Sequence, residues 1–171
     1  MIHVLVVQLI FWISRWKENK VIKKNFKKLF VLGNRFRGDD AICLLVVDQL
    51  KPKLKEMFHI REHSGEMSSL ISEWEEDAEI FILDAVKTSQ GESGELLVFD
   101  LNETEVPADW SQNSTHGFGL AQAIELAKSF GSFPAKATFI GINGSHWGIG
   151  ENHQFNLDNI SQDVFELLSN L

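Results

Sequence analysis

The clearest indication of the fold is the sequence EIFILD at residues 79–84. Its four apolar residues follow one another without the polar alternation that marks a half-exposed strand. A continuous apolar run of this kind is typical of a strand buried on both faces, as in a parallel sheet covered by helices. We therefore predict a central parallel strand at residues 79–83, with Asp84 at its carboxyl end.

Short apolar runs and segments of helical periodicity alternate on both sides of this strand, which is typical of β–α–β construction. Further strands are expected at residues 28–32, 57–61, 94–100 and 136–142, and helices at 39–50, 65–74, 119–130 and 157–171. Residues 94–100 are expected to form an edge strand. The pattern predicts an α/β fold, a three-layer α/β/α domain with a mostly parallel sheet of about five strands.

Local signals predict where the helices end and which faces they bury. Pro52 is expected to stop the first helix, because proline lacks the N–H group that would continue it. Ser64 is expected to cap the amino end of the second helix. The third helix is expected to bury one face, formed by Leu120, Ile124, Ala127 and Phe130.

Composition and charge limit the possible functions. The 171 residues are 44% hydrophobic and include one cysteine, Cys43, which excludes an internal disulfide and fits a reducing, cytoplasmic compartment. Seven basic residues and one acidic residue give residues 1–28 a net charge of +6, so the total of −8 leaves −14 for residues 29–171. An acidic body repels nucleic acid, which favours cations, metal centres or basic polypeptide surfaces as partners.

The amino-terminal stretch at residues 1–13 (MIHVLVVQLIFWI) is nearly all apolar and precedes a lysine-rich run. It is shorter than the roughly 20 residues that a spanning helix needs, and it lacks the pattern of a signal peptide. Three interpretations of residues 1–27 stay open: a membrane-surface anchor, an additional helix, or a translation start placed too early. We favour the third, with Val21 as an alternative start, and assign residues 28–171 to a single domain.

Polar side chains follow the predicted strands where each strand ends. Asp39 and Asp40 follow the first strand, Asp84 follows the central strand, and His116 precedes the helix at residues 119–130. In open α/β sheets, ligands collect outside the carboxyl ends of the strands. Two carboxylates and an imidazole from three separate loops suit a divalent transition metal with open coordination positions.

Each of these residues also has a purely structural interpretation. Asp39 and Asp40 precede a helix, where acids cap free N–H groups, so we expect at least one of them to be a cap. Asp84 is the stronger candidate, because a buried carboxylate without a partner is costly. His116 alone in a polar loop indicates little, and Cys43 is expected to be a small buried apolar residue.

Five segments together resemble the hydrogenase maturation protease family, endopeptidases that process the large subunits of nickel–iron hydrogenases. They are residues 31–40 (VLGNRFRGDD), 62–66 (EHSGE), 81–86 (FILDAV), 114–120 (STHGFGL) and 141–144 (GING). The segments occur in the family's order, and the resemblance extends from about residue 28 to the carboxyl terminus. Several ordered matches are more specific than any one motif.

The resemblance implies a cytoplasmic, aspartyl-type endopeptidase that removes a C-terminal peptide from a hydrogenase large-subunit precursor. It implies that Asp40, Asp84 and His116 contact nickel that the precursor supplies, so that nickel is a recognition signal and trigger rather than a resident cofactor. Asp40 is expected to be the catalytic base, supported by Asp39. The metal has three possible effects: orienting the scissile peptide, polarising its carbonyl, or acidifying a water molecule.

Three residues depart from the family pattern: Val31 and Cys43 replace glycines, and Asn143 stands where an acid is common. We expect Val31 to tighten the turn after the first strand. Since the three metal-facing positions are kept, we predict an active enzyme. Two alternatives are a non-cleaving maturation factor that docks the precursor and a hydrolase of small substrates with a resident metal.

Overall fold

Residues 79–86 form the central strand of a five-stranded sheet in the computed structural model, which describes residues 27–74, 78–88, 91–104, 119–150 and 155–171. The strands are β1 (Lys27–Leu32), β2 (His59–His63), β3 (Glu79–Val86), β4 (Leu96–Asp100) and β5 (Lys136–Asn143). They lie in the order β2-β1-β3-β5-β4, and only β4, at one edge, pairs antiparallel. The predicted sheet is confirmed, whereas residues 1–26 and His116 lie outside the described residues.

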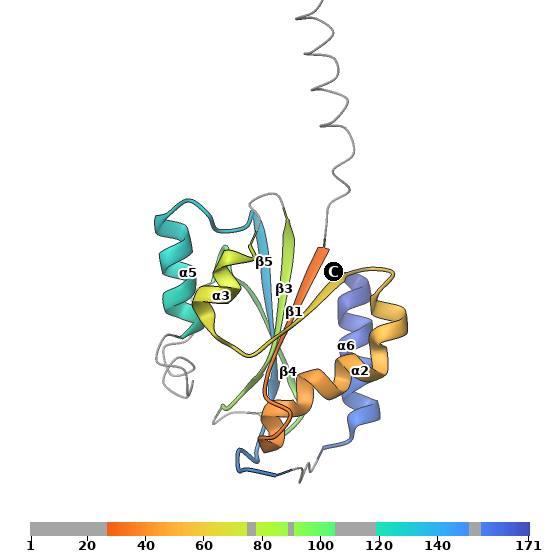
Figure 1. Cartoon of the computed structure of the whole chain (residues 1–171). Helices are drawn as coiled ribbons and strands as arrows, with labels where there is room; N and C mark the ends of the chain where they lie inside the picture. Colours follow the sequence, from red (N-terminus) through yellow and green to blue (C-terminus); the bar gives the residue numbers. More distant parts are fainter. Residues whose placement is uncertain (1–26, 75–77, 89–90, 105–118, 151–154) are drawn as a thin grey trace, which may run out of the picture.

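Helices cover both faces of the sheet (Figure 1). One face carries α2 (Ile42–Leu54) and α6 (Leu157–Asn170), and the other carries α3 (Met67–Ser72) and α5 (Leu120–Ser129). Successive residues of β3 alternate between the two cores: Phe81 and Leu83 face α2 and α6, and Ile80 and Ile82 face the opposite layer. This alternation explains why residues 80–83 are all apolar, and it confirms the three-layer architecture. Among the described residues, no helix combines the length and apolar character needed to cross a bilayer.

The first helix differs from its prediction at both ends. The 3-10 helix η1 (Gly38–Ala41) precedes α2, and α2 continues through Pro52 to Leu54. The prediction that Pro52 stops the helix is wrong, because a proline in the last turn removes one N–H group while the extension buries Leu54 completely. Burying a leucine side chain contributes roughly 2 kcal/mol, which offsets much of that loss.

Two predictions for the other helices are also wrong. The amino end of α3 is capped by Glu66 rather than Ser64, since the Glu66 carboxylate accepts hydrogen bonds from the N–H groups of Ser68 (3.1 Å) and Ser69 (2.8 Å). Phe130 was expected to be buried, but 76% of it is exposed. Phe130 is the carboxyl cap of α5, where the chain turns away from the core at Gly131, and Ala123 fills the buried face instead.

The turn after β1 depends on Gly33 and not on Val31. Val31 is fully buried within β1, opposite Glu62 of β2 and Leu83 of β3, so the expectation that it tightens the turn is wrong. Gly33 has a φ of +144°, and a Cβ atom there would come within 2.2 Å of the carbonyl oxygen of Asp40. This close approach brings η1 back over the carboxyl end of the sheet.

We expect Gly33→Ala to lower the free energy of unfolding by about 3 kcal/mol or more, because the substitution combines backbone strain with overlap against Asp40. Gly131→Ala is the matched control: it also has a positive φ, of +67°, but its Cβ would meet nothing within 4 Å. We expect it to cost only about 1 kcal/mol. Urea denaturation measures the free energy of unfolding of both variants. Equal decreases in the two variants would contradict the close approach of Gly33 to the Asp40 carbonyl.

Candidate functional site

Asp40 and Asp84 lie at the carboxyl edge of the sheet on two neighbouring elements. Asp84 lies within β3, which extends three residues beyond the predicted strand and pairs Asp84 with Gly141 of β5. Asp40 lies on η1, held by a hydrogen bond from its N–H group to the Arg37 carbonyl (2.9 Å) and by one from the Asn34 N–H group to its own carbonyl (3.2 Å). Because β1 and β3 are adjacent, the segment following β1 returns beside Asp84.

The two acids are electrostatically coupled. Burial, together with the negative charge of Asp40, raises the pKa of Asp84 from its usual 3.8 to about 7. The Ala85 N–H group donates to Asp84 Oδ1 (2.8 Å) and opposes the shift only in part. The Asp84 side chain keeps some contact with solvent. It can therefore exchange a proton, or take up a cation in place of one, close to neutral pH.

Asp39 does not cap a helix but connects η1 to the loop after β5. Its buried carboxylate crosses to the loop after β5, where Oδ2 accepts hydrogen bonds from the N–H groups of Ser145 and His146, both at 2.6 Å. The Asp39 N–H group donates in turn to the His146 carbonyl (2.7 Å). Neither acid is an N-cap residue: Arg37 precedes η1 and Ala41 precedes α2. Asp39 thus fixes η1, and with it Asp40, against the loop after β5.

The turn after β5 has a glycine, Gly144, where the Asp39 side chain packs against it. A Cβ atom on Gly144 would lie 2.9 Å from both Asp39 Cβ and Trp147 Cζ2, so a larger residue would push the loop away. The Asn143 side chain, nearly fully buried, accepts from the Thr88 N–H group (3.3 Å) and donates to the Glu92 carbonyl (3.1 Å). Since a carboxylate cannot donate, asparagine suits this position better than the acid common in the family.

Cys43 lies behind the two acids, fully buried in α2, which confirms its prediction as a small packing residue. Burial raises the pKa of its thiol well above the usual value, and the charges of Asp84 and Asp40 add to the effect. The thiol therefore stays neutral and is a poor metal ligand.

The third predicted ligand, His116, lies outside the described residues, so the complete trio is not seen together. Within the part of the chain that the structure describes, no three histidine, cysteine, aspartate or glutamate side chains are grouped to hold a metal. Two of the three predicted metal contacts, Asp40 and Asp84, are thus placed at one edge of the sheet. The contribution of Ser145 and His146 was not foreseen, because it is made by their backbone N–H groups.

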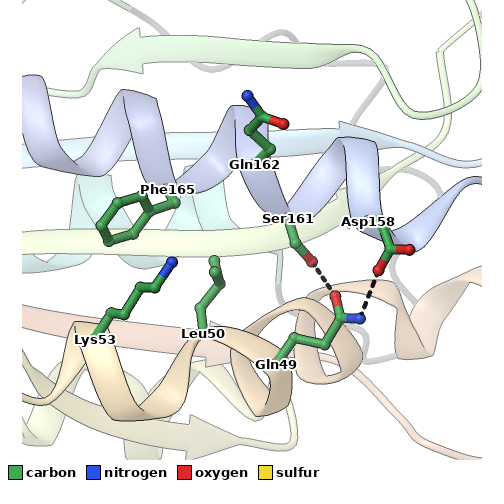
Figure 2. Close-up of a pocket in the computed structure, with 7 residues that line it drawn as sticks. All are labelled: Gln49, Leu50, Lys53, Asp158, Ser161, Gln162 and Phe165. Carbon is green, nitrogen blue, oxygen red and sulfur yellow. Dashed lines mark hydrogen bonds between the residues drawn. The ribbon is translucent and has the colours of Figure 1, made fainter.

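A separate hollow between α2 and α6 does not belong to this site. It has a volume of about 570 Å³, and Figure 2 shows polar contacts across it. Ser161 Oγ donates to Gln49 Oε1 (2.5 Å), and Gln49 Nε2 donates to Asp158 Oδ1 (3.0 Å). These bonds join the two helices, and none of the three acids at the sheet edge lines the hollow.

Known proteins are similar to this chain in sequence and in fold. A family model described as "Hydrogenase maturation protease" matches residues 46–159. The chain is 26% identical over 114 residues to the hydrogenase 2 maturation protease of Escherichia coli (strain K12), covering 65% of this chain and 68% of that protein.

Two solved structures share the fold. The hydrogenase maturating endopeptidase HybD of E. coli has a TM-score of 0.65 and 20% identity, over 84% of this chain and 89% of that chain. The [NiFe] hydrogenase maturation protease HybD of Thermococcus kodakarensis has a TM-score of 0.64 and 19% identity, over 85% and 97% respectively.

We expect Asp39→Ala to destabilise the protein by about 3 kcal/mol, because it leaves the N–H groups of Ser145 and His146 without their acceptor. Asp39→Asn keeps one oxygen for both N–H groups and is expected to cost clearly less. Urea denaturation compares the two variants. An alanine variant as stable as the asparagine variant would show that the carboxylate does not hold the two loops together.

We expect Asp84→Asn to raise the free energy of unfolding by roughly 2–4 kcal/mol near pH 8 and to change it little near pH 4. The folded protein binds the Asp84 proton more tightly than the unfolded chain, since the pKa is about 7 instead of 3.8. The resulting stabilisation is complete below the unfolded pKa and is lost as the pH rises through about 7. Asparagine carries no charge at either pH.

Urea denaturation at the two pH values measures this difference. Asp163→Asn, on the exposed face of α6, is the matched control and should change stability by less than about 0.5 kcal/mol at both pH values. An Asp84→Asn variant that is no more stable than wild type near pH 8 would contradict the cost of ionising this carboxyl.

Proposed function

Since this chain belongs to the hydrogenase maturation protease family, we propose that it removes a C-terminal peptide from the nickel-loaded precursor of a nickel–iron hydrogenase large subunit. Family membership makes it a peptidase of hydrogenase maturation. The observation that carries the proposal is the position of Asp40 beside Asp84, whose pKa is raised to about 7. We propose a cytoplasmic location, which suits the single, unpaired Cys43.

The electrostatics of the two acids support nickel as the trigger. In the free protein, the charge of Asp40 makes ionisation of Asp84 unfavourable. A divalent cation between the two carboxylates would remove this repulsion and displace the Asp84 proton. Nickel carried by the precursor would supply that cation, so a precursor without nickel would meet a partly protonated site with little affinity for it.

In the proposed reaction, Asp40, Asp84 and His116 contact the nickel of the precursor and so position the scissile peptide beside Asp40. A water molecule attacks the peptide carbonyl carbon, and Asp40 accepts the proton of that water. The C–N bond then breaks, and the proton passes to the amine nitrogen of the departing peptide. Asp39 keeps Asp40 in place for these steps through its two 2.6 Å hydrogen bonds.

The main alternative is a maturation factor that docks the precursor without cutting it. Its support was the replacement of two glycines by Val31 and Cys43. Val31 lies in a regular part of β1 and Cys43 fills the core behind the acids, so neither displaces Asp40 or Asp84. The placement of these two residues favours the cleaving enzyme.

Incubation with a cognate large-subunit precursor, with and without nickel, followed by intact-mass measurement, tests the proposal. We expect loss of a C-terminal peptide only from the nickel-loaded precursor. Asp84→Ala and His116→Ala should abolish this loss while circular dichroism shows a folded protein, because each removes one nickel contact.

Full processing by both variants would contradict the metal role. An unchanged mass with loaded, cognate precursor would favour the non-cleaving factor. Tight retention of metal by the isolated protein would instead favour a hydrolase with a resident metal, because an enzyme that borrows nickel from its substrate should purify largely without it.

A further inference from the structure

Two large apolar side chains lie exposed beside the candidate site. Phe36, four residues before Asp40, is 77% exposed, and Ile149, in the loop after β5, is 95% exposed. Single exposed apolar residues are common on protein surfaces, but neighbouring ones beside a functional site often mark an interaction surface. We call the pair Phe36 and Ile149 the apolar rim.

Backbone contacts hold the two residues of the apolar rim next to each other. Arg37 and Gly150 form a parallel bridge, and the residue before each bridged residue is a member of the rim. The Gly150 N–H group donates to the Phe36 carbonyl (3.3 Å), and the Gly38 N–H group donates to the Gly150 carbonyl (2.9 Å). Because neighbours at the same register of a parallel pair point to the same side, Phe36 and Ile149 share one face.

The backbone under the apolar rim is also tightly packed. Gly38 has a φ of +44°, and a Cβ atom there would lie 2.3 Å from the His146 carbonyl oxygen. Asp39 ties the same two segments together through Ser145 and His146. The rim is therefore presented on a fixed support, and binding a partner to it costs little conformational entropy.

Position favours an apolar stretch of polypeptide as the occupant. Arg35, next to Phe36, has its guanidinium bound to Asp48 and to Glu62 Oε2 (3.0 Å), which compensates its charge. Phe36 lies on the segment that leads into η1 and Asp40, so a chain bound at Asp40 would pass close to this segment. A second copy bound over the rim would compete with that chain for access to Asp40.

We propose that Phe36 and Ile149 form a docking surface for an apolar segment of the hydrogenase precursor that lies next to the scissile peptide. This inference rests on the proposed function and adds a specificity-determining contact that is separate from the metal. Binding of nickel would then depend on a metal-loaded precursor, and binding to the apolar rim would depend on the sequence of the polypeptide that carries the metal. Phenylalanine is among the residues that are enriched at the cores of protein interfaces.

The test compares Phe36→Ala, Ile149→Ala and the double variant with wild type. Phe130→Ala is the matched control, because Phe130 is similarly exposed (76%). It lies between the end of α5 and the start of β5, and so at the amino ends of the parallel strands, opposite the candidate site. Binding of nickel-loaded precursor is measured by calorimetry, processing by intact mass, self-association by sedimentation velocity, and folding by thermal unfolding.

We expect the double variant to unfold at the wild-type temperature, because both side chains are exposed, and to bind the precursor at least about tenfold more weakly. KM should rise by a similar factor with little change in kcat, since Asp40 and Asp84 are untouched. Phe130→Ala should match wild type in every measurement.

Unchanged precursor binding in the double variant would overturn the docking surface while leaving the proposed function intact, provided that wild type cleaves. Loss of wild-type self-association with unchanged precursor binding would assign the rim to a second copy and also overturn it. If wild type binds the precursor but does not cut it, the proposed function fails. The difference in precursor binding between wild type and the double variant then still shows whether the apolar rim is a docking surface. If wild type does not bind the precursor, both proposals fail.

Discussion

The buried carboxylate of Asp39 is the contact on which the carboxyl edge of this sheet depends. One oxygen atom accepts two hydrogen bonds of 2.6 Å from the loop after β5, and the segment that supplies it follows β1. β3, which carries Asp84, lies between the two strands whose following segments this contact joins. The two segments that it joins carry Asp40 and Phe36 on one side and Ile149 on the other.

The edge that Asp39 assembles is not optimised for the stability of the free protein. Asp40 and Asp84 carry like charges in a partly desolvated environment, and the raised pKa of Asp84 records the cost of holding them together. The exposed rim adds apolar surface that water must cover. Both features become favourable when a cation and an apolar chain arrive together, which is what a nickel-loaded polypeptide would bring. Local costs of this kind are common where a protein binds or reacts.

The departures from the family pattern are accommodated by packing. Val31 extends the regular pairing of β1 with β2 and β3, where a β-branched residue is favoured. Cys43 fills space behind the acids as a neutral thiol, and Asn143 both donates and accepts where an acid would only accept. The geometry of Asp40 and Asp84 does not require glycine at the first two positions. It does require glycine at Gly33, where a Cβ atom would overlap the Asp40 carbonyl oxygen, and it favours glycine at Gly144, where a Cβ atom would press against the side chains of Asp39 and Trp147.

Local sequence patterns were sufficient to predict the layers, the succession of strands and helices along the chain, and the placement of Asp40 and Asp84 after two of the strands, because each depends on periodicity or on the strand-end rule. The predictions for Pro52, Ser64 and Phe130 were wrong. Burial of Leu54 extended the helix past Pro52, Glu66 took the capping position expected for Ser64, and Phe130 lies outside the core at the end of its helix. The hydrogen-bond partners of Asp39 and the strength with which Asp84 holds its proton emerge only in the folded protein. The partners of Asp39 lie 106 and 107 residues away and use backbone atoms, which leave no pattern in side-chain identity. The pKa of Asp84 likewise depends on its burial and on the charge of Asp40, which comes from a separate segment of the chain, so no single stretch of sequence encodes it.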